Sequence, residues 1–110
     1  MTMERHLFVL QRLSAMVLAP LVLIHLGLIF YAVRDGLTAA EILGRTQGSL
    51  GWALFYGLFV LAAAVHAPLG LRNILREWTP AGTGLVNLLA LAFGLLLAVL
   101  GLRAVVAVVA

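Results

Sequence analysis

The chain has no cysteine and no lysine, and only 10% of its 110 residues are charged. Without cysteine it has no ligands for an iron–sulfur cluster, no attachment point for a c-type heme and no disulfide framework. Soluble domains carry roughly 25% charged residues, so a chain that is 65% hydrophobic and this poor in charge lies outside that class. A soluble domain of this size also exposes too much surface to hide so much apolar area. These observations indicate an integral membrane protein.

Three runs lack Asp, Glu, Lys and Arg altogether: Leu13–Val33, Leu50–Leu71 and Leu85–Leu102. Each is long enough, at 1.5 Å per residue, to cross a hydrocarbon core of about 30 Å, the third with help from its flanks. They show no period-two alternation, which favours helices over the strands of a barrel. The sequence predicts an all-α membrane protein in a single domain, residues 1–110, with transmembrane helices at about 10–33, 50–74 and 84–104.

The arginines give an orientation. Four of them flank the spans at the N-terminal end: Arg5, Arg12, Arg72 and Arg76. The linker at the opposite end has two arginines, balanced by two acidic residues, so the positive-inside rule predicts a cytoplasmic N-terminus and an outside C-terminus. The formal charge of +3 reflects this topology and indicates no nucleic-acid binding, because the arginines form no patch. Residues 39–43 of that linker are expected to form a brief interfacial helix.

His66 lies inside the second span, where an ionisable side chain is a functional candidate by default. Small residues share its helical face: Ala62, Ala63 and Gly70. Such a face leaves room for a flat heme whose iron the imidazole would bind, and Arg72 would meet the heme propionates near the interface. The same pattern also suits an interhelical hydrogen bond and plain helix packing.

His25 lies inside the first span and is either a second heme ligand or a packing residue. Counted along the helices, the two histidines differ in depth by about 5–11 Å. Two axial ligands of one iron each need a bond of roughly 2 Å, so this offset disfavours a heme shared between them. If His66 binds a heme iron, the second axial ligand of that iron is expected from another chain.

Two motifs resemble those of the cytochrome b membrane-anchor subunits of succinate dehydrogenase and fumarate reductase. Residues 11–15 (QRLSA) are similar to that family's His-Arg-x-Ser-Gly. Residues 66–77 (HAPLGLRNILRE) are similar to its His-x-x-x-Gly-x-Arg-His-x-x-x-Asp, with the spacing preserved. The resemblance covers essentially the whole chain. Four positions depart from the pattern: Gln11, Ala15, Asn73 and Glu77.

The resemblance implies roles for particular residues. His66 takes the place of the axial ligand of heme b, and Arg72 that of the arginine beside the propionates. Arg12 and Ser14 fall on positions associated with a quinone pocket for ubiquinone or menaquinone, while Phe8 replaces a serine that contacts quinone in many members. Ser14 would donate a hydrogen bond to the quinone, or bond back to the carbonyl of Leu10 as serines in helices do.

The resemblance also implies an assembly. The chain would be half of a larger heme-binding bundle in the bacterial inner membrane, completed by a second anchor chain, identical or a sister, and holding one heme b or two per pair. A flavoprotein with FAD and an iron–sulfur subunit would dock on the cytoplasmic face, and succinate electrons would pass to quinone. The chain itself has no residues for the dicarboxylate chemistry.

Three other readings stay open. The chain would anchor a fumarate reductase or another flavoprotein dehydrogenase, or it would be a non-heme structural subunit in which His66 bonds two helices together. A small oligomeric transporter is disfavoured, because the spans offer little polar lining.

Overall fold

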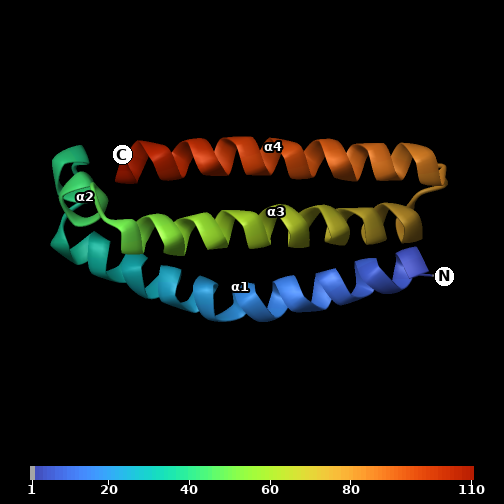
Figure 1. Cartoon of the computed structure of the whole chain (residues 1–110), viewed down its shortest axis with the longest axis horizontal. Helices are drawn as coiled ribbons and strands as arrows, with labels where there is room; N and C mark the ends of the chain where they lie inside the picture. The colour runs from blue at the N-terminus through green and yellow to red at the C-terminus, as the bar shows by residue number, and fades with distance from the viewer. Residues whose placement is uncertain (1) are drawn as a thin grey trace.

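The structure is a computed structural model that describes residues 2–110. It has four helices: α1 (Thr2–Asp35), α2 (Ala39–Thr46), α3 (Leu50–Trp78) and α4 (Thr83–Val109), and no strand within the described residues. The three long helices run alongside one another with α3 between α1 and α4, in a bundle 48 Å long (Figure 1). Each is long and apolar enough to cross a membrane. The predicted all-helical, three-span architecture is therefore confirmed.

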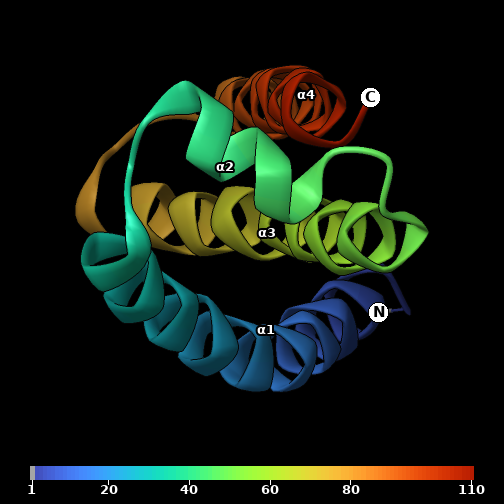
Figure 2. The same ribbon diagram turned by 90° about the vertical axis from the view of Figure 1, so that its left-hand side faces the viewer.

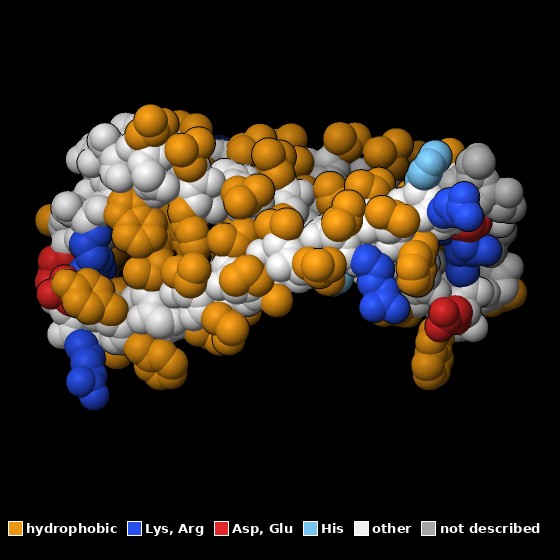
Figure 3. All heavy atoms as spheres, turned by 60° about the horizontal axis from the view of Figure 1, so that its bottom comes forward, with side chains coloured by type: hydrophobic (Ala, Val, Ile, Leu, Met, Phe, Trp, Pro, Cys, Tyr) orange, Lys and Arg blue, Asp and Glu red, His pale blue; other side chains and the backbone are white. Residues whose placement is uncertain are grey.

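α1 and α4 extend beyond residues 10–33 and 84–104 at both ends, whereas α3 begins at residue 50 and extends beyond residue 74 only at its C-terminal end. Each of α1 and α3 also runs through an internal proline, Pro20 and Pro68 respectively. A proline removes one backbone hydrogen bond and tends to bend a helix, and α1 is visibly bowed in Figure 1. Seen from the α1 side, charged side chains gather at the two ends of the molecule and hydrophobic ones cover its middle (Figure 3).

Two glycines set the distance between α4 and α3. A Cβ atom at Gly94 would lie 2.9 Å from Cγ of Pro68, and one at Gly101 would lie 2.5 Å from Cγ1 of Val60. Small residues at such contacts let helix backbones approach closely, which is how helices associate in lipid. The face of α3 that bears Val60 and Pro68 is therefore covered by α4.

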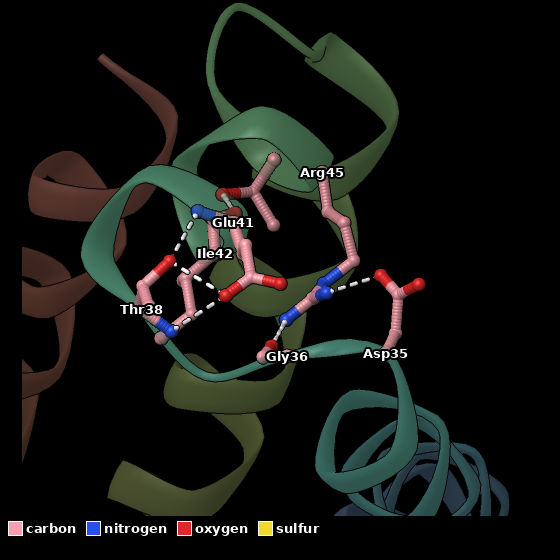
Figure 4. A network of polar contacts seen from close by, with 7 residues as sticks. Asp35, Gly36, Thr38, Glu41, Ile42 and Arg45 are labelled. Atoms are coloured by element: carbon pink, nitrogen blue, oxygen red, sulfur yellow. Dashed lines mark hydrogen bonds and ion pairs between the residues drawn. The ribbon is translucent and has the colours of Figure 1, made fainter.

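The short helix α2 crosses the end of the bundle opposite the N-terminus (Figures 1 and 2). Thr38 and Glu41 form a capping box at its start, and Arg45 donates to Asp35 at 2.7 Å and to the carbonyl of Gly36 at 2.8 Å (Figure 4). The hydrogen bonds donated by Thr38 hold the pKa of Glu41 below its ordinary value, so the carboxylate of Glu41 stays ionised at neutral pH. The short helix expected at residues 39–43 is present and is three residues longer.

The residues that end α2 also cap α4. The hydroxyl of Thr46 donates to the carbonyl of Val108 at 2.6 Å, and the backbone N–H of Gly48 donates to that of Val109 at 2.8 Å. The last carbonyls of a helix have no partner within it, so these bonds satisfy groups that would otherwise be left open. They fix α4 to the connection between α1 and α3.

We predict that Gly36→Ala destabilises the chain by about 1–3 kcal/mol, because φ at this residue is +136° and a non-glycine residue is strained there. The new Cβ would also overlap the carboxylate of Glu41 and displace it from the capping box. Thermal unfolding of the purified chain in detergent measures the effect. Gly44→Ala, in α2 with open space around it, is the control and is expected to stabilise by up to about 1 kcal/mol. Equal stability of the two variants would contradict this assignment.

Candidate functional site

His66 meets α1 through Ser14. The two come from the middle of α3 and the first third of α1, and the Oγ atom of Ser14 lies 3.4 Å from Nδ1 of His66. Ser14 is 8% exposed and its hydroxyl also donates to the carbonyl of Gln11 at 3.0 Å. The imidazole itself is partly exposed, and its Nε2 has no hydrogen-bond partner among the described residues. One ring nitrogen is thus held inside the chain while the other is free to bind something else.

The rotation of α3 places His66 away from α4. Ala64 and Pro68, which lie against Gly94 of α4, are each two residues from His66, or about 200° around the helix. Of the small residues expected beside the imidazole, Ala62 is buried, and Gly70 faces the side-chain amide of Gln11 on α1. Part of this surface therefore serves the contact between α1 and α3, as the packing interpretation requires.

Arg72 is buried at the N-terminal end of the bundle, where its guanidinium joins three helices. Its NH1 and NH2 groups donate to the two carboxylate oxygens of Glu4 on α1 at 3.2 and 3.0 Å, and its Nε donates to Oδ1 of Asn87 on α4 at 2.7 Å. Arg76 adds a bond to the same carboxylate at 2.5 Å. A two-pronged arginine–carboxylate pair is the strongest form of this interaction, and burial requires it, because an unpaired buried charge is costly.

Arg12 is exposed on the surface of α1, and no hydrogen bond between its side chain and Ser14 is found among the described residues. Its guanidinium lies 5.1 Å from the ring centroid of Phe8, one turn earlier on the same helix. A neighbouring pocket of about 360 Å³ opens at this end of the bundle between α1 and α3. Its polar lining includes Gln11, Asn73 and Arg76, and the side-chain oxygen of Gln11 is buried there without a hydrogen-bond partner.

His25 lies among aromatic rings near α2. Its ring stands edge-on to Phe59 and Tyr56, with centroid distances of 5.3 and 6.1 Å. A cavity of about 310 Å³ beside it is lined mainly by apolar side chains of α3 and α4. No hydrogen bond to the imidazole is found among the described residues, in contrast to His66.

The two histidines are far apart along the bundle. Ser14, which marks the level of His66, is eleven residues from His25 on α1, and this corresponds to about 16 Å. The separation is larger than the 5–11 Å counted from the sequence, because His66 lies nearly level with Arg12. One iron cannot take both side chains as axial ligands.

Sequence reasoning singled out His66, Ser14 and Arg72 but missed what they bond to. Glu4 and Asn87, the partners of Arg72, are 68 and 15 residues away from it in the sequence. Of the two alternatives for the hydroxyl of Ser14, a bond to a backbone carbonyl of its own helix is the one observed. The acceptor is the carbonyl of Gln11 and not that of Leu10. Only a buried position for Arg72 could have signalled that an acidic partner was needed.

Three apolar helices of spanning length define the chain as an integral membrane protein. A model of the succinate dehydrogenase/fumarate reductase transmembrane subunit family matches residues 2–110, and the chain belongs to that family. Members are in general heme-containing cytochrome b anchors that associate with the catalytic subunits. No curated protein and no solved structure matches the chain.

We predict that Arg72→Lys lowers the free energy of unfolding by about 1–3 kcal/mol, because an ammonium cannot bond both carboxylate oxygens of Glu4 and also reach Asn87. Arg76→Lys is the matched control. Its side chain is 44% exposed and an exposed pair contributes about 0–1 kcal/mol, so little change is expected. Thermal unfolding in detergent compares the two variants. A larger loss in the Arg76 variant would show that the exposed arginine, and not the buried one, joins the helices.

Proposed function

We propose that this chain is the heme b-binding membrane anchor of a succinate:quinone oxidoreductase, which docks the flavoprotein and iron–sulfur subunits and passes their electrons to quinone. The observation that carries the proposal is His66, a membrane histidine with Nδ1 held by Ser14 and Nε2 left without a partner. Membership of the transmembrane subunit family supports it. His25, by contrast, has only ring edges beside it and no oxygen that orients either of its nitrogens.

The imidazole of His66 has the hydrogen-bonding arrangement of a heme ligand. Metal-binding histidines as a rule donate their other ring N–H to an oxygen, and Ser14 is placed to accept it. The imidazole is partly exposed, so a second anchor chain would be able to reach it and supply the other axial ligand. A bound heme would supply one-electron redox chemistry, with a potential set by its ligands and burial.

Arg72 would bind a heme propionate while keeping its structural bonds. A guanidinium has five N–H groups, and Glu4 and Asn87 take three of them, one on each nitrogen. Two N–H groups therefore stay available at the same end of the bundle as His66. The carboxylate of Glu4 already holds this guanidinium in place, so a propionate would meet a preoriented cation.

Quinone would bind at the N-terminal end of the bundle, beside Arg12. The pocket lined by Gln11, Asn73 and Arg76 supplies amide and guanidinium N–H donors for a quinone carbonyl. The buried side-chain oxygen of Gln11, which has no partner among the described residues, would accept a hydrogen bond from a hydroxyl of the reduced quinol. Arg12, which lies over Phe8, would orient the head group from the surface side. Ser14 lies two residues further along α1, and its hydroxyl proton is already donated to the carbonyl of Gln11. It is therefore better placed to accept a hydrogen bond from His66 than to donate one to a quinone.

The arginine distribution supports a cytoplasmic location for this end of the chain, where the soluble subunits would dock. A bacterial inner membrane fits this arrangement. Whether succinate is oxidised or fumarate is reduced depends on the potentials of the partners. An anchor for fumarate reductase or for another flavoprotein dehydrogenase would use the same residues of this chain.

We predict that His66→Ala abolishes the b-type α-band in the dithionite-reduced minus oxidised spectrum of the purified complex. The loss is expected because iron would lose its axial ligand from this chain. His6→Ala, an exposed histidine near the N-terminus, is the matched control and is expected to keep the band. A full α-band in a His66→Ala complex with all its subunits would instead support the non-heme role for this residue.

We predict that His25→Phe leaves heme content unchanged, because the imidazole packs edge-on against Phe59 and Tyr56 and a phenyl ring can do the same. His25→Ala is expected to keep the heme but to unfold more easily, by about 0.5–1.5 kcal/mol for each lost ring contact. Heme per complex is measured by the pyridine hemochrome assay. Loss of one heme from a pair in both variants would make His25 the ligand of a second heme.

A further inference from the structure

Ser14 is one of the few buried polar residues in the described part of the chain, and it has two neighbours for one hydroxyl. The carbonyl of Gln11 is 3.0 Å from Oγ and Nδ1 of His66 is 3.4 Å from it. A carbonyl can only accept a hydrogen bond, whereas Nδ1 donates or accepts according to the tautomer. A hydroxyl has a single proton, and the shorter contact to Gln11 takes it.

The hydroxyl oxygen is then an acceptor toward His66. Nδ1 must carry a proton to donate to it, and in a neutral imidazole this leaves Nε2 unprotonated. Nε2 is the nitrogen without a partner among the described residues, and its lone pair is therefore available to a ligand. We propose that Ser14 is a positioning residue that fixes the tautomer and the ring orientation of His66 so that Nε2 is ready to bind heme iron. This inference rests on the proposed function.

The opposite arrangement would have the opposite consequence. If Ser14 donated its proton to Nδ1, the proton of the imidazole would lie on Nε2 and block metal binding there. The bond to the Gln11 carbonyl prevents this by occupying the hydroxyl proton. Gln11 and Ser14 belong to α1, whereas His66 belongs to α3. The tautomer of His66 therefore depends on the packing of these two helices.

A hydrogen bond accepted from Nδ1–H also makes the imidazole a stronger electron donor to iron, which favours the oxidised state of the heme. Removing the acceptor is therefore expected to raise the midpoint potential of the heme. Loss of such an outer partner typically weakens metal binding about 10–100-fold. Both effects are properties of the heme itself and are measured without turnover.

The test compares Ser14→Ala, Ser14→Thr and Ser49→Ala in the intact purified complex. Potentiometric titration of the b-type α-band and heme retention through gel filtration are the two readouts. Ser14→Ala is expected to raise the midpoint potential of the heme and to lose heme at least about tenfold more readily. Ser14→Thr keeps the hydroxyl, so its potential and heme retention are expected to match those of the unmodified complex. Ser49 caps α3 at the opposite end, so Ser49→Ala is expected to reduce stability with no shift in potential.

Unchanged potential and heme retention in Ser14→Ala would overturn the inference. So would equal shifts in Ser14→Ala and Ser14→Thr, because packing and not the hydroxyl would then be the cause. The His66→Ala complex separates these results from failure of the proposed function. If that variant keeps its heme, the ligand assignment itself is wrong; if it loses heme while Ser14→Ala behaves as the unmodified complex, only the role of Ser14 is wrong.

Discussion

The bonds of the buried Arg72 guanidinium to Glu4 and Asn87 are the interaction on which the helix arrangement depends. They join α1, α3 and α4 at one end, and the capping bonds of α2 to the last carbonyls of α4 join them at the other. Between these ends the contact of Ser14 with His66 is polar, and the other contacts are mostly apolar or made by small residues. Lipid provides little preference for one apolar contact over another. Polar bonds at the two ends therefore decide which residues of neighbouring helices face each other.

This register places Ser14 opposite His66. A slip of one helical turn between α1 and α3 would move the two apart by about 5.4 Å and leave the imidazole without an oriented partner. The position of α4 matters equally, because α4 covers the face of α3 that bears Pro68 and does not cover His66, which remains partly exposed. The same polar bonds that stabilise the bundle thus hold one nitrogen of His66 against Ser14.

The features that the sequence could predict are local ones. The three spans, the short helix after the first of them and the two motifs each depend on residues that are close together in the chain. The contacts of Arg72 and Ser14 could not be predicted in the same way, because Glu4 and His66 are 68 and 52 residues from them and face them only at one rotation and one register of the helices. Even the local bond of Ser14 was uncertain by one residue, since carbonyls three and four positions earlier are both within reach in a helix.

The two membrane histidines differ in a way that composition could not reveal. His66 has an oxygen that orients it, whereas His25 has only the edges of Phe59 and Tyr56 beside it. Ring edges restrict the plane of an imidazole but leave open which nitrogen carries the proton. A ligand at His25 would therefore need a partner chain to choose its tautomer, whereas the tautomer of His66 is chosen within this chain. On the proposed function, the number of hemes in the assembled complex would therefore depend on the partner at the α2 end, and a heme at His66 would depend on the contact of that residue with Ser14.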